Sequence, residues 1–327
     1  MSQGSQGNHE FATDKTLFCL RSPGIVTMSH MKFFSGRTAV MLISALVLST
    51  LPAPSSSAAV VSFPDVRPFK LFVPTTYDPS VPIPLILALH GYGQSSAQFE
   101  KYLGLTSIAQ TRGFLYVHPD GTKDRAGTQF WNATPECCDF QSPKVNDDAY
   151  LMSIIDEVSS KYAVDSQRIY IIGHSNGGFM TNRMACNHAD RIAAVVNMAG
   201  GSFTKSALCA PKVPISILEV WGTADETYVG NHIIGKPIPG AIKTISTWAA
   251  INQCSTSGEK QPDKIDLDPV IKGAETTITD FPQCPIGTSV QLWSIAGANH
   301  VPHMSQTFAS MMVDFLLAHP KASSITN

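Results

Sequence analysis

The segment RIYIIGHSNGGFM, residues 168–180, constrains the possible fold more than any other part of the sequence. Residues 169–172 form an apolar, largely β-branched run typical of a buried strand, and Met180 and Met184 continue beyond it at helical spacing. Glycines between the two patterns allow the backbone to turn sharply. The segment therefore predicts a strand that ends in a tight turn at Ser175 and leads directly into a helix.

The pattern Gly173-x-Ser175-x-Gly177 is that of a nucleophile elbow, in which small flanking residues hold a serine hydroxyl clear of the sheet. The amino end of the following helix can stabilise negative charge on a substrate oxygen, and the N–H of Asn176 is the first candidate donor. The alternative is a glycine-rich turn that only packs tightly or binds a phosphate. The catalytic interpretation requires a base and an acid elsewhere in the chain that can partner Ser175.

Strands and helices alternate along most of the sequence, and this alternation predicts a mainly parallel central sheet covered by helices on both faces, an α/β fold. The 327 residues carry a net charge of −2 and are 43% hydrophobic, which favours a soluble protein with a large core and gives no indication of nucleic-acid binding. One catalytic domain over residues 60–327 is the simplest organisation. The expected strands cover residues 69–74, 84–90, 114–119, 169–172, 192–200, 215–222 and 289–295, and the expected helices cover residues 147–158, 241–251 and 308–316.

The N-terminal part of the chain has the layout of a secretory signal peptide. Lys32 and Arg37 precede an apolar stretch over residues 39–51, and small residues lead to a cleavage site after Ala59. The apolar stretch is shorter than a bilayer-spanning helix requires. We therefore expect residues 31–59 to be a signal peptide and residues 1–30 to be a non-native or mis-started extension, with translation starting at Met31 or Met28.

Removal of the signal peptide leaves six cysteines, an even number that suggests disulfide bonds in a secreted chain. Fifteen pairings are possible, and the sequence does not choose among them. Because Cys137 and Cys138 are adjacent, we expect them to bond to different partners, Cys186 and Cys209, and Cys254 to bond to Cys284. Zinc binding is the competing interpretation, but the cysteines lack CxxC spacing and the histidines are scattered.

Two loops after later strands offer partners for Ser175. Asp225 follows the strand at 215–222, and His300 follows the last strand, so the order Ser, acid, His is that of the α/β-hydrolase triad. An imidazole can take the serine proton during attack, and a carboxylate fixes its tautomer and stabilises its charged form. Glu226 and His303 remain alternatives for the acid and the base.

A second oxyanion donor is expected after an earlier strand. The segment LALHGYGQSS places glycines at a strand end, which makes the backbone N–H of Tyr92 the natural partner of the Asn176 N–H. Trp131, Trp221 and Tyr228 lie on or near the same loops. They are the candidates for contact with an aromatic acyl group or a polymer strand, although aromatic residues near a sheet edge also serve as core.

The chain resembles the secreted polyhydroxybutyrate depolymerases and the related feruloyl and acetylxylan esterases of the α/β-hydrolase fold. The resemblance rests on HGYGQ, PDGT, FWNATPECCDF, VNDDAYLMSIIDEV, RIYIIGHSNGGFMTNRMAC and WGTAD, which occur in this order between residues 65 and 318. It implies Ser175, Asp225 and His300 as the triad and Tyr92 and Asn176 as oxyanion donors. The histidine segment departs from the family's pattern: the family often has GGGH followed by an aromatic residue and proline, whereas this chain has GANHVPH.

The resemblance implies a secreted, extracellular or periplasmic, serine carboxylic-ester hydrolase that forms an acyl-enzyme and needs no cofactor or metal. Its expected substrates are feruloyl, aryl or acetyl esters of plant polysaccharide, or a polyhydroxybutyrate-type polyester. We expect a monomer whose partner is a small or polymeric ester, with no nucleic acid and no membrane after signal cleavage. A secreted serine peptidase of the same fold is the alternative, because the same triad also cleaves amides.

Overall fold

The computed structural model describes residues 59–62, 67–141, 144–233 and 235–321. The expected N-terminal extension lies outside the described residues, as does the expected signal peptide apart from Ala59, which begins the first strand. The described residues belong to one compact unit. Among them, no helix has the length and apolar character needed to cross a bilayer.

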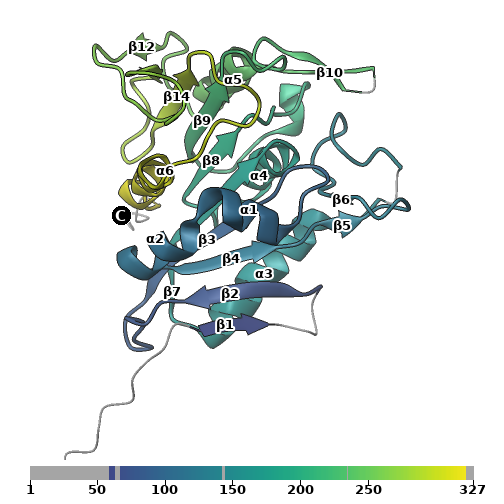
Figure 1. The fold of residues 1–327 in the computed structure, drawn as a ribbon, viewed down its shortest axis with the longest axis vertical. Helices are drawn as coiled ribbons and strands as arrows, with labels where there is room; N and C mark the ends of the chain where they lie inside the picture. The colour runs from purple at the N-terminus through teal and green to yellow at the C-terminus, as the bar shows by residue number, and fades with distance from the viewer. Residues whose placement is uncertain (1–58, 63–66, 142–143, 234, 322–327) are drawn as a thin grey trace, which may run out of the picture. The chain divides into compact units, whose positions relative to one another are not determined.

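A ten-stranded sheet runs through this unit in the order β1-β2-β4-β3-β7-β8-β9-β14-β13-β12 (Figure 1). Its six central strands are parallel: β4 (Leu115–Pro119), β3 (Ile83–Leu89), β7 (Val164–His174), β8 (Ala194–Met198), β9 (Ser216–Gly222) and β14 (Val290–Ile295). Antiparallel strands form both edges: β1 (Ala59–Ser62) and β2 (Phe69–Val73) at one, β13 (Thr276–Asp280) and β12 (Glu259–Lys260) at the other. The expected mainly parallel sheet is confirmed.

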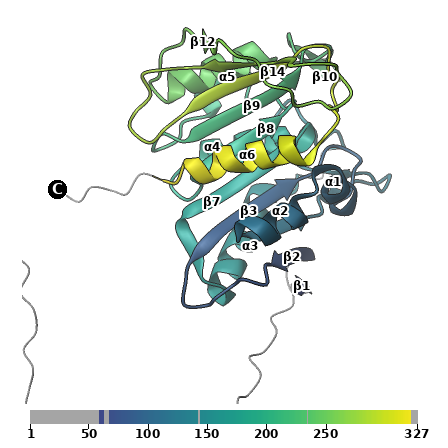
Figure 2. The same cartoon turned by 60° about the vertical axis from the view of Figure 1, so that its left-hand side comes forward.

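Helices cover both faces of the sheet (Figure 2). One face carries α3 (Asp147–Lys161), α4 (Asn176–His188) and α5 (Ala241–Ile251). The other carries α1 (Ser96–Leu103), α2 (Leu105–Arg112) and α6 (Gln306–Ala318), and a 3₁₀ helix spans Ser206–Leu208. Two small hairpins are added within the described residues: β5 (Thr122–Lys123) with β6 (Gln129–Phe130), and β10 (Asn231–Ile233) with β11 (Lys236–Ile238).

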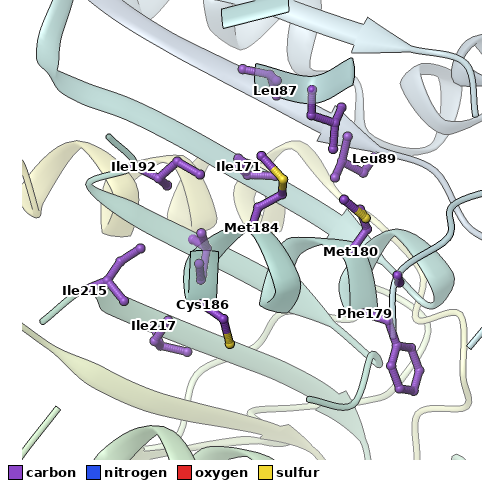
Figure 3. Close-up of a cluster of buried hydrophobic side chains, with 14 of the residues drawn as sticks. Leu87, Leu89, Ile171, Phe179, Met180, Met184, Cys186, Ile192, Ile215 and Ile217 are labelled. Carbon is purple, nitrogen blue, oxygen red and sulfur yellow. The ribbon is translucent and has the colours of Figure 1, made fainter. Parts of the chain in front are cut away.

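The parallel strands read as nearly continuous apolar runs because both of their faces are buried. In β3, alternate residues enter the two opposite cores, with Leu85, Leu87 and Leu89 on the side of α4 and Ile86 and Ala88 on the side of α6. Figure 3 shows Met180 and Met184 of α4 pointing toward the strand residues of the first core. Met180 and Met184 lie on one face of α4 because of their helical spacing, and they pack that face against the sheet just after β7 ends.

The structure corrects two of the three expected cysteine pairs. Cys254 bonds to Cys284 as expected, but Cys137 bonds to its neighbour Cys138. Cys186 of α4 bonds to Cys209, which the chain brings back beside α4 after the 3₁₀ helix, with the two Cα atoms 4.9 Å apart. Adjacency in sequence therefore did not prevent the bond between Cys137 and Cys138.

A buried polar cluster lies between α4 and the strands that follow it. Glu219 of β9 is fully buried and accepts hydrogen bonds from Asn197 Nδ2 at 2.5 Å and from Trp221 Nε1 at 3.1 Å. Burial raises the pKa of Glu219 from 4.5 to about 8, against the opposing effect of the hydrogen bonds that it accepts. The carboxyl is therefore held neutral around pH 7 in the folded protein.

This raised pKa predicts a specific dependence of stability on pH. The unfolded chain releases the Glu219 proton near pH 4.5 and the folded chain only near pH 8, so Glu219 makes the free energy of unfolding fall as pH rises through this window. Glu219→Gln should remove that part of the slope, which urea unfolding at pH 5 and pH 8 would measure. Glu259→Gln, at an exposed position on β12, is the matched control and should leave the slope unchanged. Equal slopes in the wild type and in Glu219→Gln would contradict the assignment.

Candidate active site

Ser175 occupies the expected sharp turn between β7 and α4, with φ of 55° and ψ of −118°. Its backbone N–H donates to Met198 O of β8 at 2.7 Å, which fixes the turn against the neighbouring strand. A Cβ at position 177 would collide with the carbonyl oxygen of Leu89 at the end of β3. Gly177 is therefore required by close backbone packing, and this packing leaves the Ser175 side chain partly exposed.

The structure brings Ser175, His300 and Asp225 into one hydrogen-bonded line. His300 Nε2 lies 2.9 Å from Ser175 Oγ, and His300 Nδ1 lies 2.7 Å from Asp225 Oδ2. These residues follow the carboxyl ends of β7, β14 and β9, which lie within a run of four adjacent strands, β7-β8-β9-β14. A neutral imidazole that donates from Nδ1 to the carboxylate presents an unprotonated Nε2 to the serine, as proton removal requires.

Asp225 is held as an anion although its side chain is buried. Burial alone would raise the pKa of this carboxyl, but hydrogen bonds with His300 and Thr227 outweigh burial and leave the pKa below its usual value. Thr227 donates to Asp225 Oδ1 from both its backbone N–H and its hydroxyl, at 2.8 Å each. Both carboxylate oxygens therefore have partners, and Oδ2 is directed at the imidazole.

The two alternatives in the same loops have different surroundings. His303 Nδ1 lies 3.3 Å from the carboxylate of Asp268, and its side chain is 63% exposed. Glu226 is exposed and lines the pocket beside Ser175, whereas Asp225 faces His300. No group of three or more His, Cys, Asp or Glu side chains in the described ranges has the arrangement of a metal site.

The backbone N–H groups of Tyr92 and Asn176 are placed as oxyanion donors would be. Asn176 is the first residue of α4, where an N–H has no intrahelical acceptor. Within the described part of the chain, neither N–H is used in a hydrogen bond. Gly91, which precedes Tyr92, lies against Ser175, since a Cβ there would be 3.4 Å from Ser175 Cβ. Both donors therefore adjoin the Ser175 side chain.

The Asn176 side chain holds the loop that follows β6. Its Oδ1 accepts from Trp131 N at 2.7 Å, and its Nδ2 donates to Trp131 O at 2.9 Å. The same Nδ2 contacts Cys137 Sγ at 3.7 Å. The residue that follows Ser175 and begins α4 thus also fixes one wall of the adjacent pocket.

A cavity of about 540 Å³ opens beside Ser175, His300 and Asp225. Apart from these residues and the Glu226 rim its lining is mostly apolar. It includes the Cys137–Cys138 disulfide and the side chains of Tyr92, Phe140, Phe179, Ile233 and Ile238. Sequence reasoning missed all of these as pocket residues except Tyr92, because they lie on an irregular loop, a helix and the β10–β11 hairpin rather than at strand ends.

The three aromatic residues expected to touch substrate lie elsewhere. Trp131 and Trp221 are fully buried, and their indole N–H groups donate to His90 O and to Glu219. The Tyr228 hydroxyl lies 3.1 Å from Ser294 Oγ, in a separate depression. The two tryptophans serve as core packing instead. The aromatic side chains that line the pocket include Tyr92 and Phe140, whose ring centroids are 5.3 Å apart.

Comparison with known proteins finds relatives named as esterases and polyester depolymerases. A feruloyl esterase B from Piromyces equi is 30% identical over 227 residues, which cover 66% of this chain and 39% of that protein. Poly(3-hydroxyalkanoate) depolymerase C from Paucimonas lemoignei is 28% identical over 125 residues, which cover 37% of this chain and 28% of that protein. The chain thus spans well under half the length of these two relatives.

Solved structures share the fold at low sequence identity. An acetyl xylan esterase from Aspergillus awamori superposes with a TM-score of 0.57 and 16% identity, covering 79% of this chain and 99% of that one. The predicted α/β-hydrolase fold is confirmed by this likeness and by the sheet described above. The family model for esterase PHB depolymerases matches residues 69–220, and this segment of the chain therefore belongs to that family, as its sequence resemblance predicted.

Proposed function

We propose that this protein is a secreted serine carboxylic-ester hydrolase that works through an acyl-enzyme. The observation that carries the proposal is the continuous line of hydrogen bonds from Ser175 through His300 to Asp225 beside an open apolar cavity. The names of the relatives and the family match over residues 69–220 support the same reaction class. Ser175, His300 and Asp225 stand in the order that acyl transfer needs of a nucleophile, a base and an orienting acid, which supports the proposal.

In the proposed mechanism Ser175 Oγ attacks the ester carbonyl carbon while His300 Nε2 takes the hydroxyl proton. The carbonyl oxygen becomes an oxyanion that accepts hydrogen bonds from the backbone N–H groups of Tyr92 and Asn176. His300 then gives its proton to the departing alkoxide, and the acyl group stays on Ser175. Water, deprotonated by His300, releases the acid by the reverse sequence, and Asp225 stabilises the imidazolium in both halves.

The pocket favours an ester with a bulky apolar group. Its volume of about 540 Å³ lies in the range of pockets that hold drug-sized ligands and is far larger than an acetyl group fills. The paired rings of Tyr92 and Phe140 offer a surface for an aromatic acyl group. We therefore propose feruloyl or related aryl esters as preferred substrates, ahead of hydroxybutyrate polyester and acetylated polysaccharide.

Secretion is part of the same proposal. The predicted signal peptide at residues 31–59 and the three disulfide bonds both fit an oxidising, extracellular or periplasmic location. The cytosol keeps thiols reduced, so structural disulfides of this kind persist mainly outside it.

The first prediction of the proposal concerns substrate and nucleophile together. Initial rates of purified mature protein on methyl ferulate should exceed those on soluble hydroxybutyrate oligomers, because the pocket carries an aromatic surface. Ser175→Ala should lower both rates by about 10⁴ to 10⁶, since it removes the covalent nucleophile. Faster oligomer cleavage would reverse the substrate order, and activity retained in Ser175→Ala would exclude the mechanism.

A second prediction separates the two histidines of one loop. His300→Ala should lower kcat by roughly 10⁴ or more, because it removes the base that contacts Ser175. His303→Ala is the matched control and should stay within about tenfold of wild type, because the His303 backbone N–H that donates to Asp268 survives the substitution. Comparable losses in both variants, measured on the same ester, would contradict the assignment of His300.

A further inference from the structure

Residues 299–304, the loop that carries His300 between β14 and α6, have no regular secondary structure. Side chains from three distant parts of the chain bond to its backbone instead. His174 Nε2 lies 2.9 Å from His300 O, and the Tyr102 hydroxyl donates to Pro302 O at 2.7 Å. The N–H of His303 donates to Asp268 Oδ2 at 2.9 Å. The backbone from His300 to His303 is thus held by side chains.

The contact from His174 fixes the protonation state of this residue. A carbonyl oxygen only accepts, so Nε2 of His174 carries the proton that bonds to His300 O. The side chain is buried, and its Nδ1 has no partner among the described residues. Burial lowers the pKa of His174 to about 4, so the ring is neutral near pH 7. A neutral ring places no second positive charge beside His300 when that residue takes the serine proton.

Tyr102 and His174, which both bond to the loop backbone, belong to one packed group of aromatic rings. Their rings are 6.0 Å apart, the ring of Phe99 lies 6.3 Å from His174, and the His300 ring lies 5.2 Å from His174 on the active-site side. Burial raises the pKa of the Tyr102 hydroxyl, which keeps it a donor. Neither Tyr102 nor His174 lines the substrate pocket.

Asp268 belongs to a different segment, between α5 and β13. It is 1% exposed, and its carboxylate also accepts from Val270 N at 3.0 Å. The N–H of Asp268 is itself bonded to the buried carboxylate of Glu275 at 3.2 Å. The third anchor is therefore fixed by its own loop and does not depend on the aromatic group formed by Tyr102 and His174.

We propose that Tyr102, His174 and Asp268 are positioning residues that hold the backbone of residues 300–303 so that His300 stays in line between Asp225 and Ser175. This inference rests on the proposed function, because only the proposed function makes His300 a base whose position matters. The His300 side chain is 39% exposed, so solvent on one side leaves room for the ring to shift if its backbone moves. A displacement of about 1 Å at a reacting group can lower a rate about 10²-fold.

Tyr102→Phe tests the anchor with the least disturbance of packing, because it removes only the hydroxyl. On an aryl ester we expect kcat to fall about tenfold with KM unchanged, since the substrate pocket is intact. Tyr150→Phe is the matched control: the Tyr150 hydroxyl also donates to a backbone carbonyl, Arg67 O at 3.0 Å, from a partly buried position. Equal kcat values in the two variants would overturn the role of Tyr102.

Two substitutions at His174 separate donation from packing. His174→Gln keeps an N–H donor near the position of Nε2, whereas His174→Phe keeps a ring and loses the donor. We expect His174→Phe to lose about 100-fold in kcat and His174→Gln to recover most of that loss. Equal losses in both variants would show that the ring matters only as packing and would overturn the proposed role of its N–H.

A readout that does not require ester turnover keeps this inference separate from the proposed function. The proton shared by His300 Nδ1 and Asp225 should give a downfield ¹H resonance in the wild type and in Tyr150→Phe, and it should broaden or vanish in Tyr102→Phe and His174→Phe. Wild-type protein with this resonance but no ester hydrolysis would refute the proposed function alone. An unchanged resonance in Tyr102→Phe and His174→Phe would overturn the positioning role.

Discussion

The carbonyl oxygen of Leu89, at the end of β3, packs directly against Gly177 in the first turn of α4. This contact lets a helix begin immediately beside the carboxyl ends of two parallel strands. As a result Ser175 stands at the turn, the N–H of Asn176 points out of the helix start, and the loop with Tyr92 leaves β3 at the same place. The positions of the proposed nucleophile and of the proposed oxyanion donors thus follow from one close approach between backbones.

The loop after β14 contains two histidine–carboxylate pairs with different tasks. His300 is paired with Asp225, and its other ring nitrogen faces the nucleophile. His303 is paired with Asp268, and there the backbone N–H makes the shorter contact. The second pair closes the loop onto the segment before β13, while the first is directed into the site. Similar residue types three positions apart therefore differ in setting: one ring faces Ser175, and the other residue attaches the backbone to Asp268.

Much of this arrangement can be predicted from sequence because parallel strands bring their carboxyl ends to one edge. Ser175, Asp225 and His300 each follow a strong strand pattern, and their order limits the choice. The pairing of Cys137 with Cys138 could not be found in this way, since adjacency argued against it. Phe140 and Ile238 were missed because pocket walls depend on how irregular loops and a short hairpin fold back, which periodicity does not encode.

The paired hydrogen bonds between Asn176 and the backbone of Trp131 join the first residue of α4 to the loop that bears the pocket disulfide and Phe140. The proposed substrate surface and the start of α4, which carries a proposed oxyanion donor, are therefore joined directly. A change in the backbone of this loop acts on Asn176 through the same two hydrogen bonds. If the proposed function holds, specificity and turnover are coupled traits, and selection for a different ester has to adjust both at once.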